Sequence, residues 1–383
     1  MDTPTREAAA GGRVHFLDNL RTAMIFLVVL YHSGVVYESS GLLGFFWIVD
    51  DPATNDVAGL VNLVIDLFAM PAIFFVSGFL APLSIAKTSA RGFLARRFRR
   101  LMVPWLLAVL VLIPIYKVMF LVARGLPQEH WTTYFHFSNG VFSQSWLWFL
   151  PVLFAFDVLF LLLEEGGMRP RRLPLGPTIG VALVAAIAYS FALSIMGRTG
   201  WTKTILFDFQ NERLLVYFLV FLIGALCSER GVFAAEPGRK RGYVVASALA
   251  WIPVNVYVLV LLNLLFRPGQ PIVSLPVDLL VLWTACYLSM AALLYIVVST
   301  FRFWIGGRGP LARALGVNAY GVYIVHMIVL GALALLLLRA DIPSLGKYAT
   351  LTVGTWVASN LLVYAYREVL RSRILVPLLA RAT

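Results

Sequence analysis

The feature that most limits the fold of this chain is a series of long apolar stretches separated by short polar segments. The first stretch, LRTAMIFLVVLYHSGVVY, begins at Leu20. Most of the stretches reach the roughly 20 residues that an α-helix needs to cross about 30 Å of hydrocarbon. The later ones lie near residues 57–81, 101–123, 145–163, 178–196, 213–228, 243–266, 272–298, 314–338 and 348–366. The pattern predicts an all-α, polytopic membrane bundle of about ten transmembrane helices.

Composition and charge agree with this class of protein. Hydrophobic residues make up 60% of the chain and charged residues only 13%, which is typical of polytopic membrane proteins. Residues 38–56 between the first two stretches contain no Lys or Arg, whereas residues 87–100 after the second contain six. Because basic loops stay on the cytoplasmic side, this alternation predicts that both termini are cytoplasmic. The net charge of +12 is therefore interpreted as a topology signal, and nucleic-acid binding is not expected.

No segment resembles a separate soluble domain or a cleaved secretory signal. We expect residues 1–14 to form a cytoplasmic tail and residues 15–383 to form one transmembrane domain. Cys227 and Cys286 fall within or at the end of apolar stretches, so neither a disulfide framework nor a metal motif is predicted.

Arg21 and His32 are the ionisable side chains of the first apolar stretch. Their separation of eleven residues corresponds on a helix to about 1100° of rotation and an axial offset of about 16 Å, so both lie on one face. A charge at membrane depth costs roughly 3 kcal/mol or more unless it faces a polar interior. The pair therefore predicts a polar cavity along this helix.

The second stretch carries Asn62, Asp66 and Ser77 on one side of the predicted helix, with Pro71 between them. In the predicted topology, Asp66 and His32 reach similar depths from the outer surface. A carboxylate beside an imidazole fixes its tautomer, as a general base requires, so we expect Asp66 to orient His32. The alternative is that Asp66 only hydrogen-bonds a neighbouring helix.

The ninth stretch contains Tyr320, Tyr323 and His326 at near-helical spacing. These side chains are candidates for a polar wall of the same cavity. The alternative is an aromatic helix packed against its neighbours, with one histidine whose hydrogen bonds are satisfied.

Four arginines precede the third stretch: Arg96, Arg97, Arg99 and Arg100. Guanidinium groups bind phosphates in bidentate fashion, and an Arg-x-x-Arg spacing places two of them on one helix face. The cluster is therefore a candidate phosphate-binding site. Topology determination and contact with anionic lipid headgroups explain the same residues equally well.

The segment 130–150 is rich in aromatic side chains, of which Trp131, Tyr134, Trp146 and Trp148 are candidates for stacking on a sugar ring. An interfacial aromatic belt is the alternative. His130 and His136 lack partners at metal-ligand spacing, so no metal is assigned to them.

Five ordered blocks together resemble the acyltransferase 3 family of integral membrane acyltransferases. They are Arg21-x10-His32 preceded by FLDNL, then FFVSGFL, RRFRRLMVPWLL, WLWFLPVLFAF and NAYGVYIVHMIVL. The resemblance covers nearly the whole chain, and the wording of the first and last blocks is most similar to the glucan-modifying branch, typified by the osmoregulated periplasmic glucan succinyltransferase.

The resemblance implies a multi-pass protein of the bacterial cytoplasmic membrane that transfers an acyl group, acetyl or succinyl, from cytoplasmic acyl-CoA to a hydroxyl of an extracytoplasmic glycan. It implies that His32 is catalytic, that Arg21 contacts the donor, and that Arg96 and Arg99 form the family's basic Arg-x-x-Arg element. The expected partners are acyl-CoA, the acceptor and membrane lipids. No tightly bound cofactor is expected, and no pattern specifies an oligomeric state.

Two other classes of function remain open at this stage. Intramembrane ionisable residues also line transport pathways, so a transporter or flippase with an Arg/His relay is the chief alternative, although no inverted repeat is apparent. A non-catalytic subunit that binds a lipid-linked sugar is the third.

Overall fold

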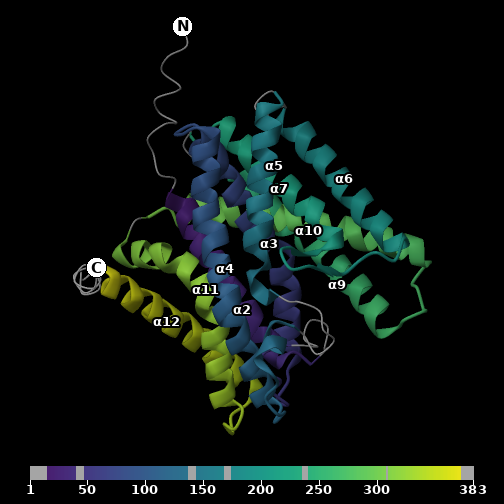
Figure 1. The fold of residues 1–383 in the computed structure, drawn as a ribbon. Helices are drawn as coiled ribbons and strands as arrows, with labels where there is room; N and C mark the ends of the chain where they lie inside the picture. Colours follow the sequence, from purple (N-terminus) through teal and green to yellow (C-terminus); the bar gives the residue numbers. More distant parts are fainter. Residues whose placement is uncertain are drawn as a thin grey trace. The chain divides into compact units, whose positions relative to one another are not determined.

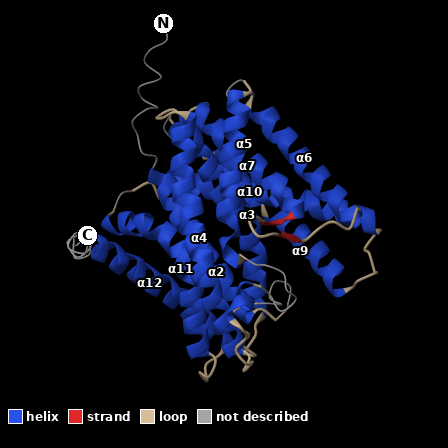
Figure 2. Ribbon diagram, in the orientation of Figure 1, coloured by secondary structure: helices blue, strands red, loops and turns tan. Residues whose placement is uncertain are grey.

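The computed structural model describes residues 15–39, 47–136, 144–167, 174–234, 240–307 and 309–371. The predicted tail, residues 1–14, lies outside the described residues. Helices dominate the fold, and the described strands form a single two-stranded hairpin, drawn red in Figure 2. The prediction of an all-α membrane bundle is confirmed.

The helices follow the predicted apolar stretches in order along the chain (Figure 1). They are α2 (His15–Tyr37), α3 (Asp56–Ile85), α4 (Ala90–Ala123), α5 (Phe149–Glu165), α6 (Leu175–Ile195), α7 (Asn211–Glu229), α8 (Arg241–Leu249), α9 (Trp251–Phe266), α10 (Leu275–Trp304), α11 (Pro310–Leu337) and α12 (Ser344–Arg371). With α8 and α9 taken as one span, 9 helices in the described residues are long and apolar enough to cross a membrane. The chain is therefore a multi-pass membrane protein. The long helix α12 is more polar than these 9 and is not counted among them.

The structure differs from the predicted apolar stretches in two places: at the beginning of α4, and within the stretch that forms α8 and α9. The 34-residue α4 begins at Ala90, so the arginine cluster forms its first turns. A helix of that length is about 51 Å long, which exceeds the hydrocarbon thickness and leaves room for a polar end. The division between α8 and α9 falls at Ala250. Pro253 explains it, because proline has no N–H to bond the carbonyl four residues earlier.

The chain divides into two compact units. Unit 1 comprises Met1–Leu20, Leu63–Val109 and Ser138–Gly307. Unit 2 comprises Arg21–Asn62, Leu110–Phe137 and Arg308–Thr383. Helices α2, α3 and α4 each pass from one unit to the other along their own length.

In unit 1, α3 and α7 meet backbone to backbone at two glycines. A Cβ added to Gly78 would lie 1.9 Å from the carbonyl oxygen of Phe221, and one added to Gly224 would lie 2.2 Å from that of Phe75. Small residues permit this approach between membrane helices. The ion pair between Asp66 and Arg213 lies earlier on both helices than the contact between Gly78 and Phe221. Helices α3 and α7 therefore run in the same direction, as the predicted second and sixth spans should.

The hairpin of unit 1 joins β1 (Trp201–Lys203) to β2 (Asp208–Gln210). Asp208 joins it to the segment before α5, since its carboxylate accepts a hydrogen bond from the backbone N–H of Gln144 as well as one from Thr204 between the two strands. Burial raises the pKa of this carboxyl group, and the two backbone hydrogen bonds oppose that rise.

In unit 2, α11 and α12 lie side by side (Figure 1). A Cβ added to Gly321 of α11 would meet the side chain of Val363 on α12 at 2.8 Å, so glycine again permits close packing. Elsewhere in this unit the Lys117 ammonium, inside α4, reaches Glu129 beyond the end of that helix at 3.3 Å. The long lysine stem thus carries its charge toward the polar surface.

Candidate functional site

Two histidines from distant parts of the sequence meet in unit 2. Nδ1 of His32 on α2 lies 2.8 Å from Nε2 of His326 on α11, and the two rings are nearly parallel with centroids 5.0 Å apart. His326 is fully buried, whereas His32 is partly exposed. Of the two histidines, His326 is therefore the more deeply buried.

Backbone groups hold both histidines. Nδ1 of His326 lies 2.7 Å from the carbonyl oxygen of Tyr323, one turn earlier on α11. The indole N–H of Trp47 donates a 3.1 Å hydrogen bond to the carbonyl of His32. Among the described residues, none hydrogen-bonds Nε2 of His32.

Arg21 makes a second contact between α2 and α11. Its guanidinium donates a 3.3 Å hydrogen bond to the carbonyl oxygen of Gly316, near the beginning of α11. Arg21 and His32 thus contact α11 at two levels in the same order along both helices. The two helices run in the same direction, which agrees with their predicted places as first and ninth spans.

The side chains of α11 that we expect to form a polar wall have little exposed surface. Tyr323 is buried and Tyr320 partly buried. The structure brings His326 into contact with His32, whereas the roles of the two tyrosines in binding a substrate remain predictions.

Asp66 has a different partner from the one expected. In unit 1, its carboxylate forms a 2.6 Å ion pair with the guanidinium of Arg213 on α7. The hydrogen bond that the structure gives the His32 ring is to His326. Asp66 joins α3 to α7, as its structural alternative proposed, and the orientation of His32 by Asp66 stays a prediction.

Sequence reasoning did not single out Arg213, because as the first residue of the sixth apolar stretch it counts equally as part of the loop before it. The helix begins two residues earlier, at Asn211, and this places Arg213 in its first turn. Its burial, with only 9% of the residue exposed, follows from the pairing with Asp66. Ser77, eleven residues after Asp66 on α3, is partly exposed, and its proposed contact with substrate stays a prediction.

The arginines at the start of α4 separate into buried and exposed members. Nε of Arg97 lies 3.3 Å from the carboxylate of Asp157 on α5, whose side chain is fully buried. Arg96 is exposed and hydrogen-bonds Thr88 and the carbonyl oxygen of Ser84, at the end of α3. Arg99 and Arg100 are exposed. Packing thus explains Arg97, which leaves the other three as candidates for phosphate contact.

Trp148 belongs to an aromatic cluster in unit 1. Its ring stacks on Tyr217 of α7 at 6.0 Å and meets Trp201 of the hairpin edge to face at 5.5 Å. Trp148 is partly exposed and Trp201 exposed. The cluster presents aromatic surface next to the hairpin, and its binding of a sugar stays a prediction.

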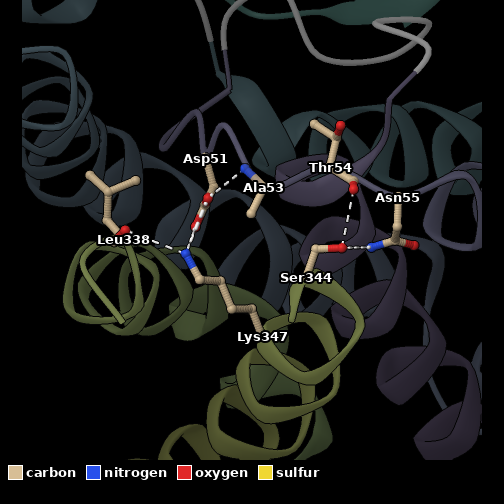
Figure 3. Close-up of polar contacts among 7 residues, drawn as sticks. All are labelled: Asp51, Ala53, Thr54, Asn55, Leu338, Ser344 and Lys347. Atoms are coloured by element: carbon tan, nitrogen blue, oxygen red, sulfur yellow. Dashed lines mark hydrogen bonds and ion pairs between the residues drawn. The ribbon is translucent and has the colours of Figure 1, made fainter. Parts of the chain in front are cut away.

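A buried ion pair fastens the segment before α3 to the start of α12 in unit 2 (Figure 3). Nζ of Lys347 lies 3.0 Å from Asp51 and also donates to the carbonyl oxygen of Leu338. The other oxygen of Asp51 accepts the backbone N–H of Ala53 at 2.9 Å. Lys347 is 4% exposed and Asp51 1%, so the charges are shielded and neutralise each other.

Within the described part of the chain, no group of three or more His, Cys, Asp or Glu side chains is arranged to hold a metal ion. Among the described ionisable side chains, the imidazoles of His32 and His326 form the arrangement that most resembles a catalytic one.

A comparison with family models matches residues 14–364 to a model described as an acyltransferase domain. Comparisons with curated proteins and with solved structures find no match.

Proposed function

The chain belongs to the acyltransferase 3 family, and from this premise we propose that it transfers an acyl group from acyl-CoA to a hydroxyl of an extracytoplasmic glycan. The observation that carries the proposal is the contact between His32, on a membrane-spanning helix, and His326, which uses Nδ1 of His32 and leaves its Nε2 without a hydrogen-bond partner among the described residues. Acetyl and succinyl groups are the proposed acyl groups, and a bacterial inner membrane is the proposed location.

His32 acts as the general base in the proposed reaction. It takes the proton of the acceptor hydroxyl while that oxygen attacks the carbonyl carbon of the thioester. The carbon–sulfur bond then breaks, and the leaving thiolate takes the proton from the His32 imidazolium. Free CoA thiol and an acylated acceptor result, and His32 returns to its neutral form.

Arg21 is proposed to bind the donor along the same helix. Its separation from His32 corresponds to about 16 Å of helix rise, a distance that an extended pantetheine arm can span. Gly316 supports the guanidinium from α11. An arginine at this position can contact the polar part of the donor while the thioester reaches His32.

The exposed arginines at the start of α4 are proposed to contact the phosphates of CoA. Arg96 and Arg99 have the spacing that places two guanidinium groups on one helix face, and Arg100 adds a further charge. The end of α4 that carries them is the predicted cytoplasmic end, where acyl-CoA is available.

The acceptor is proposed to meet the aromatic surface of Trp148 and Trp201. Large flat side chains favour stacking on the apolar faces of sugar rings, and both side chains retain exposed area. A glycan acceptor, of which a periplasmic glucan is the first example to test, follows from the resemblance of the sequence blocks.

The test is release of CoA thiol by the purified protein in lipid nanodiscs. Acetyl-CoA and succinyl-CoA are supplied separately, with and without linear or cyclic glucans. We expect thiol release that depends on acceptor, with a matching mass increase of the glucan. A transporter or a lipid-linked sugar-binding subunit would release no thiol with any donor or acceptor, and that result would contradict the proposal.

A further inference from the structure

The hydrogen bonds around His326 determine which nitrogen of His32 carries its proton. The carbonyl oxygen of Tyr323 can only accept a hydrogen bond, so Nδ1 of His326, at 2.7 Å, must carry a hydrogen. A neutral imidazole has one N–H, and Nε2 of His326 is therefore an acceptor.

The same reasoning extends to the second ring. Nε2 of His326 lies 2.8 Å from Nδ1 of His32, so Nδ1 of His32 must be the donor. Neutral His32 then has an unprotonated Nε2, the nitrogen that no described residue hydrogen-bonds. A main-chain carbonyl thus sets the tautomers of two successive imidazoles.

We propose that His326 is a positioning residue that holds His32 as its Nδ1–H tautomer, so that Nε2 of His32 is the basic atom of the acyl transfer. This inference rests on the proposed function and assigns His326 a role different from the substrate contact expected from its sequence. When His32 takes a proton, its Nδ1–H remains hydrogen-bonded to His326, which stabilises the imidazolium.

Burial supports these different roles of His32 and His326. His326 is 0% exposed, so a substrate does not reach it from outside. Serine proteases show the size of effect to expect, since an incorrect tautomer of their catalytic histidine costs about 10⁴ in turnover. The difference here is that the relay ends on an uncharged carbonyl, and we therefore expect a smaller loss, about 10²-fold.

Two replacements separate positioning from packing. His326→Phe fills the space of the imidazole but offers no acceptor, whereas His326→Gln keeps an acceptor oxygen near the place of Nε2. We expect the Phe variant to lose about 10²-fold in turnover with little change in the KM for acyl-CoA. The Gln variant should retain turnover within about tenfold of the wild type. If both variants keep the unfolding temperature of the wild type and lose turnover to the same extent, the proposal is overturned.

The tautomer itself is measured by ¹⁵N NMR of protein labelled at its 5 histidines. Signals of His32 are assigned by their loss in His32→Ala. We expect a protonated Nδ1 and an unprotonated Nε2 for His32 in the wild type, and a change of this tautomer in His326→Phe. A protonated Nε2 in neutral wild-type His32 would overturn the inference, whether or not the protein transfers acyl groups. Absence of thiol release with the expected tautomer would instead contradict only the proposed function.

Discussion

Two contacts in unit 2 join residues nearly 300 positions apart, and they use their polar atoms differently. In the Asp51–Lys347 pair, opposite charges neutralise each other, and both side chains also bond to backbone groups. In the His32–His326 pair the rings share one hydrogen bond, and Nε2 of His32 keeps an open position among the described residues. The first arrangement holds the fold together, whereas the second retains a group that can react.

The comparison teaches that burial of polar residues in this membrane protein is not by itself a sign of function. Asp66–Arg213, Arg97–Asp157 and Asp51–Lys347 are all ion pairs between different helices or segments of one unit. A buried charge without its partner is costly, and each pair removes that cost. The histidine pair differs from these three because it carries no pair of opposite charges and Nε2 of His32 has no hydrogen-bond partner among the described residues.

The largest expected effect is on turnover in His32→Ala. Removal of a positioned general base lowers the rate by about 10²–10⁴, and the thermal unfolding temperature should stay near that of the wild type because His32 is partly exposed. Initial rates of thiol release measure the loss. His130→Ala, in an exposed loop of the same unit, is the matched control and should keep normal turnover. Near-normal turnover of His32→Ala would remove His32 from the mechanism.

Lys347→Met should lower stability rather than chemistry. It leaves the Asp51 carboxylate buried without a counter-ion, which costs about 3–5 kcal/mol. We expect a lower unfolding temperature in detergent and less folded protein. In the double variant Asp51→Asn, Lys347→Met, both charges are absent and the acceptor for Ala53 is kept, so most of the stability should return. No recovery in the double variant would show that the ion pair is not the cause.

Gly78→Ala should destabilise unit 1 by about 3 kcal/mol, because its Cβ would collide with the backbone of α7. Gly176→Ala is the matched control, since a Cβ at that glycine of α6 has nothing within 4 Å. Thermal unfolding of both variants measures the difference. Equal unfolding temperatures would contradict the close crossing of α3 and α7.

The smallest of these effects is expected at the start of α4. Arg96→Gln, Arg99→Gln should raise the KM for acyl-CoA about tenfold, since a charge-assisted contact to phosphate contributes roughly 1.5–3 kcal/mol. Arg91→Gln removes one charge from an exposed position on the same helix and is the control for a general charge effect. If the double variant and this control have the wild-type KM, topology alone explains the cluster.

Arg97→Gln should instead lower the stability of the protein, because it leaves the buried carboxylate of Asp157 without its counter-ion.

Local patterns predicted the features that depend on one segment of the chain. Hydropathy predicted the helices, and the eleven-residue spacing predicted that Arg21 and His32 share one face of a helix; in the structure both contact α11. The partners of His32, Asp66 and Asp51 could not be read in this way, because tertiary packing brings together residues from separate helices or segments. Arg213 gave a partial signal, since an arginine at the first position of an apolar stretch becomes a buried residue when the helix begins slightly earlier.

The most direct test of the central claim is the affinity of His32→Ala for acyl-CoA. The account assigns His32 to proton transfer and the arginines to donor binding, so the dissociation constant measured by titration calorimetry should remain within about twofold of the wild-type value while turnover falls. A dissociation constant that rises in proportion to the loss of turnover would contradict the account, because it would make His32 a binding residue rather than the base.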